Sequence, residues 1–343
     1  MLDYHLHLWP HSDRETPLDL EQLAAYCERA AGAGVVEIAV TEHLFRFAQA
    51  DRLLGGFWDS EPSPSLRASM ARYWEHHARA DLDGYVETVL AAKQAGLPVV
   101  LGLEVDHYPG RMGEVADLLA GYPFDVLLGS VHWLGTWRFD DLDDPVSMAE
   151  WPARHVDDVW AAYTEAIEDL AASGTCDVLA HPDLVKVAGH RPDSPREWWD
   201  RIAEAVAAHR LAAEVSSAGW RKPVGEQYPA EPLLARLAAH GVPLTTASDA
   251  HHGEHVADRS ADLRHLLASI GVDRLQGFRR RQGHTVPLAP VGSTAPGGST
   301  EPGDGADGAR GAGGPGRGPA PSALGSPGDG SAARAPGAGE KRR

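Results

Sequence analysis

The chain begins with an unusual concentration of histidine. Its first eleven residues, MLDYHLHLWPH, hold His5, His7 and His11. His5 and His7 are two residues apart on a segment with strand character, so their side chains lie on the same side of that strand. Imidazole nitrogens are the commonest metal ligands among protein side chains. The spacing therefore predicts that the start of the chain supplies ligands to a metal site.

Further residues able to bind metal stand at the ends of the other apolar runs. The segments TEH, GLE, GSVH, LAH and SDAH place there Glu42, His43, Glu104, His132, His181, Asp249 and His251. A single histidine at a strand end is usually a hydrogen-bonded structural residue. Imidazoles and carboxylates at six of seven strand ends instead predict a polynuclear metal site.

Seven short apolar runs with strand character contain or precede these residues. The predicted strands cover residues 3–7, 36–40, 99–104, 126–131, 178–181, 212–216 and 243–248. Apolar residues at helical spacing predict helices between most of these strands. The predicted helices cover residues 18–34, 85–96, 159–174, 197–210 and 231–241.

Strands that alternate with helices indicate a parallel sheet. Seven or eight such units in about 280 residues predict a closed α/β barrel of the TIM-like type. An open doubly wound sheet is the alternative, although no GxGxxG motif follows the first strand. In a barrel the carboxyl ends of the strands converge on one face, so the residues able to bind metal would meet there.

The chain changes character near residue 289. Sixteen of the 55 residues from 289 to 343 are glycine, eight are proline and none is aromatic. Such a segment cannot bury enough apolar surface to offset the entropy lost on ordering. The sequence therefore predicts one barrel domain over 1–288 and a disordered Gly/Pro/Ala-rich tail over 289–343. Neutral low-complexity sequence is the favoured interpretation of the tail, and a tether is the alternative.

Composition restricts the partners and the compartment. The net charge of −18 disfavours nonspecific binding to nucleic acid. The longest apolar runs are too short to span a bilayer, and no signal-peptide pattern is visible. The two cysteines, Cys27 and Cys176, are isolated and are expected to be buried free thiols. These features predict a cytoplasmic protein without membrane association, and they leave the oligomeric state open.

The motifs DYHLH, TEH, GLE, GSVH, AHPD and SDAH, in this order, resemble those of the polymerase and histidinol phosphatase (PHP) superfamily. The spacing, with GSVHWLG and AHPDLVK, resembles its monofunctional histidinol-phosphatase branch. The resemblance covers roughly residues 1–270. It implies a distorted seven-stranded barrel and a trinuclear site of zinc, manganese or iron ions.

The resemblance also implies an assignment of ligands. His5, His7, Glu104 and Asp249 would hold the first ion. Glu104 would bridge to a second ion, which His132 and His181 complete, and His43 and His251 would hold the third. The loop LWPHSD departs from the spacing common in the family, so His11 and Asp13 both remain open as a further ligand of the third ion. Asp3 is expected to orient a ligand from behind.

The chemistry that such ions support is hydrolysis of a phosphate monoester. A hydroxide bridging two ions would attack phosphorus in line, and the cations would stabilise the developing charge. The residues assigned to catalysis are His43, Glu104, Asp249 and His251. The basic residues expected to bind phosphate are Arg191, Arg221, Lys186 and His190. An acidic partner for the amine or imidazole of a substrate is expected among Glu42, Asp106 and Glu226.

Three functions follow from this interpretation. The first is hydrolysis of L-histidinol phosphate, the penultimate step that members of the branch perform in histidine biosynthesis. The second is a phosphoesterase of the same superfamily acting on nucleotides, oligonucleotide ends or another small phosphate. The third is a metal-binding module without catalysis. An amidohydrolase would suit similar ligands, but no lysine stands near the fourth strand end to bridge two metals.

Overall fold

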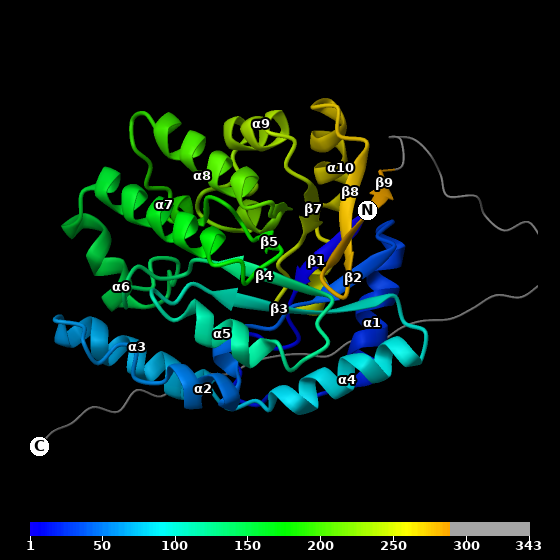
Figure 1. Ribbon diagram of the computed structural model, residues 1–343, viewed down its shortest axis with the longest axis horizontal. Helices are drawn as coiled ribbons and strands as arrows, with labels where there is room; N and C mark the ends of the chain where they lie inside the picture. The colour runs from blue at the N-terminus through cyan, green and yellow to red at the C-terminus, as the bar shows by residue number, and fades with distance from the viewer. Residues whose placement is uncertain (289–343) are drawn as a thin grey trace, which may run out of the picture. The chain divides into compact units, whose positions relative to one another are not determined.

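The computed structural model describes residues 1–288, and the predicted tail lies outside them. Seven strands form one parallel sheet in the order β1-β2-β3-β4-β5-β6-β7 (Figure 1). They are β1 Leu2–Leu6, β2 Glu37–Val40, β3 Val99–Asp106, β4 Val126–Ser130, β5 Val178–Leu179, β6 Ala212–Ser216 and β7 Leu244–Ala247. Every strand predicted from the sequence is present, with ends displaced by at most two residues.

Hydrogen bonds between β1 and the end of β7 bring the sheet close to a full barrel. The Thr246 hydroxyl donates to the carbonyl of Leu2 at 2.6 Å. The backbone N–H of Asp249 donates to His5 at 2.8 Å, and that of His7 donates to Ala250 at 2.7 Å. The HxH segment at the start of the chain therefore lies directly beside the SDAH segment that follows β7. The predicted α/β barrel is confirmed.

Helices connect successive strands and cover the outside of the sheet (Figure 1). Those in the described part of the chain are α1 Leu20–Gly32, α2 Ala48–Leu54, α3 Pro64–His77, α4 Leu82–Gln94, α5 Met112–Leu119, α6 Pro145–Glu150, α7 Val156–Ala172, α8 Arg196–Ala208, α9 Glu231–Ala239 and α10 Ser260–Ser269. The five predicted helices correspond to α1, α4, α7, α8 and α9. None of these helices is both long and apolar enough to cross a membrane.

The helices that the apolar pattern missed are short or bury a mixed face. Helix α3 buries Ser69 and His77 beside Met70 and Trp74, so polar residues interrupt its apolar stripe. Its start does carry a local signal, because the Ser63 side chain accepts from the N–H of Leu66 and a proline follows at the first helical position. Helices α2 and α6 span only seven and six residues.

A two-stranded hairpin follows α10 and was not predicted. Strand β8 (Arg274–Arg279) pairs antiparallel with β9 (Gln282–Pro287). Its turn consists of Arg280 and Arg281, whose φ angles are 50° and 61°. Turns of this kind usually carry asparagine, aspartate or glycine, so the sequence lacks the usual hairpin signal.

Three arginines at or next to this turn contact carboxylates at the amino ends of the barrel strands. The guanidinium of Arg281 lies 2.9 Å from Asp177, just before β5, and the N–H of Arg280 donates to Asp125, just before β4, at 3.1 Å. Arg279 pairs with Glu37, the first residue of β2. The hairpin therefore fastens the amino end of the barrel and leaves the carboxyl end free for chemistry.

Candidate metal centre

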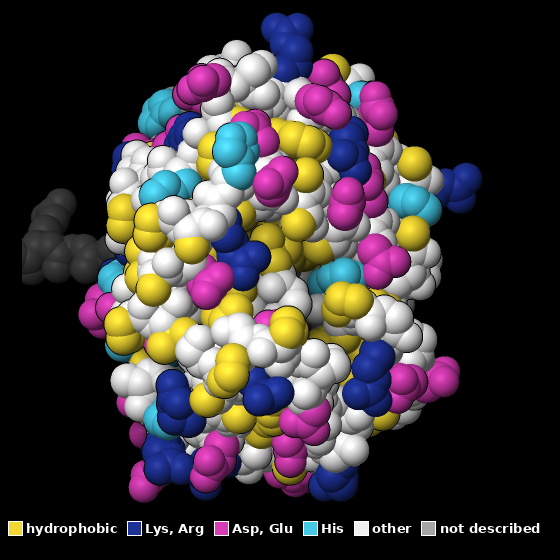
Figure 2. Space-filling model, turned by 90° about the vertical axis from the view of Figure 1, so that its left-hand side faces the viewer, with side chains coloured by type: hydrophobic (Ala, Val, Ile, Leu, Met, Phe, Trp, Pro, Cys, Tyr) yellow, Lys and Arg dark blue, Asp and Glu magenta, His cyan; other side chains and the backbone are white. Residues whose placement is uncertain are grey.

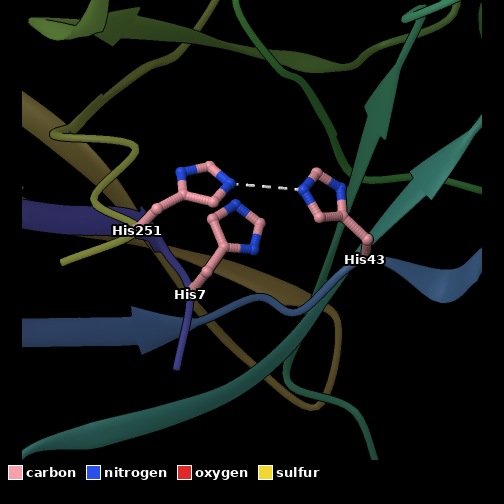
Figure 3. Close-up of side chains that lie close together, drawn as sticks. All are labelled: His7, His43 and His251. Carbon is pink, nitrogen blue, oxygen red and sulfur yellow. Dashed lines mark hydrogen bonds between the residues drawn. The ribbon is translucent and has the colours of Figure 1, made fainter. Parts of the chain in front are cut away.

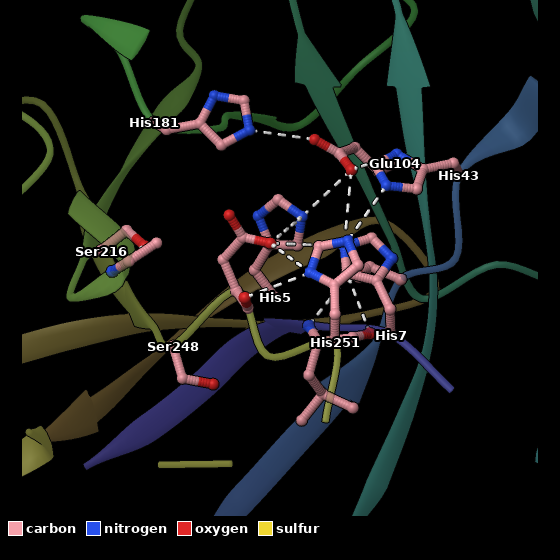
Figure 4. Close-up of polar contacts among 12 residues, drawn as sticks. His5, His7, His43, Glu104, His181, Ser216, Ser248 and His251 are labelled. Carbon is pink, nitrogen blue, oxygen red and sulfur yellow. Dashed lines mark hydrogen bonds and ion pairs between the residues drawn. The ribbon is translucent and has the colours of Figure 1, made fainter. Parts of the chain in front are cut away.

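The carboxyl ends of the strands converge around Glu104, which lies on β3 and is fully buried (Figure 4). Its Oε2 atom lies 3.2 Å from His5 Nε2 and 2.7 Å from His43 Nδ1. Its Oε1 atom lies 3.0 Å from His181 Nε2 and 3.3 Å from His132 Nε2. The two oxygens thus face two different sets of histidines, as a carboxylate bridging two cations would.

A first group of ligand atoms comes from β1 and the loop after β7. Asp249 Oδ1 lies 3.5 Å from His7 Nε2 and 3.9 Å from His5 Nε2. One ligand atom from each of these three residues lies within 4.8 Å of the others. Glu104 Oε2 stands beside the same imidazoles, so this group contains the four residues assigned to the first ion.

A second group of imidazoles consists of His7, His43 and His251 (Figure 3). The Nε2 atoms of His43 and His251 are 3.5 Å apart. The ring of His7 stacks on both, with centroids 4.2 Å from His43 and 4.1 Å from His251. His7 therefore stands between the first group and the residues assigned to the third ion.

The structure places the two alternatives for a further ligand differently. The ring of His11 stacks on that of His251, with centroids 4.4 Å apart, and lies 5.0 Å from the ring of His43. Asp13 is exposed, and its carboxylate accepts from the hydroxyl of Ser12. Both residues are exposed, but the ring of His11 contacts the cluster, whereas the carboxylate of Asp13 contacts Ser12.

Two residues of the cluster have backbone angles in the left-handed region. The φ angle is 25° at His181 and 49° at Asp249. Residues other than glycine adopt this region at an energetic cost, and such strain tends to occur at functional sites. With this backbone conformation, the side chain of His181 lies beside Glu104 and that of Asp249 lies beside His7.

Buried carboxylates stand behind several of the histidines. Glu214, on β6, accepts from His5 Nδ1 at 2.8 Å, and Asp106, at the end of β3, accepts from His132 Nδ1 at 2.6 Å. These contacts turn the Nε2 atom of each ring towards Glu104 and fix its tautomer, as outer carboxylates do in metal sites. Glu214 was not predicted from the sequence, although a glutamate inside the apolar run AAEVS was a visible signal.

Two of the acids expected to meet a substrate amine lie behind the site instead. Asp106 contacts His132, and Glu42 Oε2 lies 3.7 Å from His7 Nδ1. Glu42 Oε1 accepts from the N–H groups of Leu8 at 2.5 Å and Trp9 at 3.0 Å. Both acids are fully buried, so they organise the ligands rather than face the solvent from which a substrate arrives.

Asp3 acts on the loop that carries Asp249. Its carboxylate accepts from the N–H and the hydroxyl of Ser248, both at 2.7 Å, and from the N–H of Ala257 at 2.8 Å. It therefore positions ligands through the backbone next to them, with Ser248 as the link.

The charges in the centre favour a bound cation. Burial works to raise the pKa of Glu104, but His5 and His43 hold it well below its usual range, so the carboxylate is ionised. Burial lowers the pKa of His43 to about 3, which leaves the imidazole neutral. Burial opposes protonation of His132, yet Glu104 and Asp106 raise its pKa to about 10. A cation that binds there therefore replaces a proton.

The donor set fits divalent ions. Several buried atoms that face the centre contact one another but make no well-formed hydrogen bond among residues 1–288; they are His5 Nε2, His7 Nε2, His43 Nδ1 and Glu104 Oε2. Buried polar atoms normally find partners, so a cluster of unpartnered ones requires an explanation. Imidazole and carboxylate ligands of this kind accept zinc, manganese or iron.

The predicted phosphate-binding residues from the loop after β5 pair with acids. Lys186 is fully buried, and its Nζ atom lies 2.8 Å from Asp183 and 2.6 Å from Glu226. Arg191 Nη2 contacts the same Glu226 oxygen at 2.6 Å. The ring of His190 stacks on that of Trp151, with centroids 4.5 Å apart. Glu226, the third acid expected to meet a substrate amine, thus joins two basic residues.

Arg221 is bound to the loop after β7. It donates to the carbonyls of Ser248 at 2.6 Å and Asp249 at 3.1 Å, and it pairs with Asp258 at 2.8 Å. Its side chain remains 21% exposed and that of Arg191 35%, whereas Lys186 has no free surface. Figure 2 shows the side of the molecule on which α3 and α6 lie in Figure 1, with a central hollow and lysine or arginine and histidine side chains near it.

Comparisons with known proteins agree with this geometry. The chain matches the model of the PHP domain over residues 3–218. It is 36% identical over 219 residues to a probable histidinol-phosphatase of Deinococcus radiodurans, a match that covers 62% of this chain and 82% of the relative.

Two solved structures share the fold at 18% identity. One is histidinol phosphate phosphatase from Lactococcus lactis in complex with zinc, L-histidinol and phosphate, with a TM-score of 0.57 over 82% of this chain and 98% of that one. The other is a putative histidinol phosphatase from Listeria monocytogenes, with a TM-score of 0.60 over 76% of this chain and 99% of that one. The match to the domain model spans more than half of the chain, and the protein therefore belongs to the PHP domain family.

Proposed function

We propose that this protein is a metal-dependent phosphomonoesterase that hydrolyses L-histidinol phosphate to L-histidinol and inorganic phosphate. The observation that carries the proposal is the position of Glu104, whose two oxygens face separate sets of histidines at the open end of the barrel. The name of the Deinococcus relative and the L-histidinol and phosphate bound in the Lactococcus structure support this choice of substrate.

The metal content that we propose is three divalent ions, chosen from zinc, manganese and iron. His5, His7, Glu104 and Asp249 would hold the first, and Glu104, His132 and His181 the second. His43, His251 and His11 would hold the third, with Asp13 as the less favoured alternative to His11. Divalent ions bound there would lower the pKa of a water molecule and neutralise the charge of phosphate oxygens.

The protein's own residues prepare this chemistry. Glu214 and Asp106 accept the Nδ1 protons of His5 and His132, so the Nε2 lone pairs point into the centre. Glu104 stays ionised although it is buried, because the imidazoles around it stabilise its charge. The ligand atoms are thus held in place before substrate arrives, and little reorganisation is needed during the reaction.

Residues at the edge of the metal centre would transfer a proton to the leaving oxygen. His251 Nδ1 lies 3.5 Å from Asp249 Oδ1, and their side chains are 20% and 17% exposed. These two side chains are thus partly exposed to solvent, whereas Glu104 is fully buried. A leaving alkoxide is a strong base, so we infer that this imidazole or carboxylate would relay a proton to it from a water molecule.

The basic residues at the rim would attract the phosphate. Arg191 and Arg221 retain exposed guanidinium surface, although both also bind acids. We infer a role for them in guiding and orienting the anion, with His190 and the buried Lys186 supporting the same loops. The partner is a small phosphorylated molecule rather than a nucleic acid. Residues 1–288 would form the catalytic unit, and the site of action would be the cytoplasm.

The decisive test is phosphate release from L-histidinol phosphate by the full chain, loaded in turn with zinc, manganese and iron. Nucleotides and sugar phosphates serve as competing substrates, and His132→Ala serves as the control. We expect strong preference for L-histidinol phosphate and loss of activity in the control. Activity on other phosphates alone would keep the mechanism and reassign the substrate. Full metal loading without any hydrolysis would refute an esterase function.

A further inference from the structure

Tyr228 is a buried tyrosine beside the metal centre that the reaction described above does not use. It lies in the loop after β6 and is 1% exposed. Its backbone pairs with the last residue of that strand, because the N–H of Ser216 donates to Tyr228 at 2.6 Å and the N–H of Tyr228 donates back at 3.0 Å. The tyrosine is thus attached to the same carboxyl end of the barrel as the metal ligands.

Its ring is held on three sides. Gly219 packs against the ring: a Cβ atom added there would lie 3.1 Å from two carbons of the ring and 2.1 Å from the carbonyl oxygen of Glu226, so only glycine fits. The Nζ atom of Lys186 lies 5.2 Å from the ring centre, at a distance that suits a cation–π contact. The ring of His181 meets it edge-on, with centroids 6.4 Å apart. The position of the hydroxyl is therefore determined by packing.

The hydroxyl of Tyr228 is buried and has no hydrogen-bond partner within the described chain. Two other buried tyrosines, Tyr163 and Tyr85, differ in this respect. The hydroxyl of Tyr163 donates to the carbonyl of His181 at 3.3 Å and accepts from the N–H of Leu184 at 3.2 Å. That of Tyr85 meets two backbone carbonyls at 2.9 Å.

A buried hydroxyl without a partner costs about 1–3 kcal/mol, so one is retained where it finds a partner in another state. Tyr108 also lacks a partner, but its ring packs among those of Phe57, Trp74 and Trp133. Tyr228 is distinguished by its place against His181.

The surroundings decide what this hydroxyl can do. Burial holds the pKa of Tyr228 well above its usual range, and the carboxylates of Asp183 and Asp249 act in the same direction. The phenol is thus neutral and offers a proton in a hydrogen bond. The best acceptor for such a donor is an anionic oxygen, which makes a stronger hydrogen bond than a neutral one.

We propose that the Tyr228 hydroxyl donates a hydrogen bond to a phosphoryl oxygen of the substrate bound beside His181. The inference rests on the proposed function, because it assumes that a phosphate monoester occupies the centre. It assigns to the loop after β6 a neutral donor that complements the charged groups of the rim. The leaving oxygen is the alternative acceptor, and the experiment separates the two.

The test compares Tyr228→Phe with the wild-type full chain, both loaded with metal. Calorimetry measures the affinity for inorganic phosphate, and steady-state kinetics measure kcat/KM for L-histidinol phosphate and for p-nitrophenyl phosphate. We expect both the phosphate affinity and kcat/KM to fall about 10- to 100-fold, the range of a hydrogen bond to a charged group. The loss should be similar for the alkyl and the aryl ester. Metal content and melting temperature should stay at wild-type values.

Tyr85→Phe is the matched control, since it removes a buried tyrosine hydroxyl that binds backbone carbonyls instead. It should lower stability and leave phosphate affinity unchanged. Unchanged phosphate affinity in Tyr228→Phe would overturn the proposal, and so would loss of metal, which would make the residue a support for His181. A defect confined to the alkyl ester would reassign the hydroxyl to the leaving group and overturn the phosphoryl contact.

The same measurements separate this proposal from the proposed function. If the wild-type protein hydrolyses no phosphomonoester but Tyr228→Phe still weakens phosphate binding, the esterase function is refuted and the contact is retained. A wild-type protein loaded with metal that binds no phosphate would refute both.

Discussion

The carboxylates at the two ends of the barrel have different kinds of partner. At the amino end, Arg281 meets Asp177 and Arg279 meets Glu37, so each acid has a basic partner. At the carboxyl end, Glu104 is surrounded only by imidazoles, and several atoms that face it have no partner in the described chain. At the amino end the opposite charges neutralise one another, whereas the ligand atoms at the carboxyl end lack a cation to bind.

This difference separates stability from function. A carboxylate paired with arginine holds two segments together, and its removal is felt as lost stability. A buried carboxylate that contacts imidazoles instead of arginine or lysine depends for its stability on protons held by those imidazoles or on a bound cation that replaces the protons. Perturbation at the carboxyl end should therefore change metal binding and catalysis, whereas perturbation at the amino end should change the free energy of unfolding.

Removal of the ions should have the largest effect. Dialysis against a chelator should abolish hydrolysis of L-histidinol phosphate, and addition of zinc or manganese should restore it. The melting temperature should fall as well, since ions that bind only the folded chain stabilise it by mass action. Elemental analysis and calorimetry before and after dialysis provide the check. Full activity in chelated protein free of metal would contradict the proposed mechanism.

Substitution in the loop after β1 should distinguish His11 from Asp13. We expect His11→Ala to lose at least about 100-fold in kcat/KM, because a ligand should matter no less than the groups that orient it. Asp13→Ala should stay within about twofold of wild type, since an exposed side chain away from the centre contributes little. The number of ions per chain checks the assignment, and the reverse pattern would make Asp13 the ligand.

The loop LWPHSD shows why the sequence left this question open. Which of two side chains reaches a metal depends on how the backbone turns, and a spacing of two residues does not determine that. Strand ends are different, because β1, β3 and β7 are parallel and all carry their last residues to one face. For this reason His5, Glu104 and Asp249 were brought together as expected.

For other residues the sequence shows the type of side chain but not its partners. In the sequence, Glu214 looks like any other glutamate within a strand, and only its distance from His5 reveals its role. Lys186 and Arg191 have the right charge for phosphate, yet both contact Glu226. The hairpin was missed because its turn is made of two arginines in the left-handed region.

Loss of the carboxylate behind His5 should have an intermediate effect. Glu214→Gln keeps the shape of the side chain and removes the charge that fixes the tautomer of His5. We expect metal affinity or kcat/KM to fall about 10- to 100-fold, as is usual for outer partners of metal ligands. Glu28→Gln on the exposed face of α1 is a control of the same chemistry and should change neither quantity. Equal metal affinity in the two variants would show that Glu214 does not position His5.

The smallest expected effect on catalysis lies at the other end of the barrel. Arg281→Ala removes three hydrogen bonds to Asp177 and one to the carbonyl of Thr175, and it should cost about 1–2 kcal/mol of unfolding free energy. kcat/KM should stay within about twofold of wild type. Arg274→Ala, on the same hairpin, removes an exposed pair with Asp273 and should leave stability unchanged.

The loss of stability in Arg281→Ala should depend on pH because Asp177 titrates. Burial already raises the pKa of that carboxyl while Arg281 lowers it, so the substitution should raise the pKa further. A carboxyl whose pKa is higher in the folded than in the unfolded state destabilises the protein as pH rises through that range. The stability gap between wild type and Arg281→Ala should therefore be widest near neutral pH and shrink towards about pH 4. Urea unfolding at both pH values measures it, and a gap that grows on acidification would show that Asp177 is not the partner through which Arg281 stabilises the barrel.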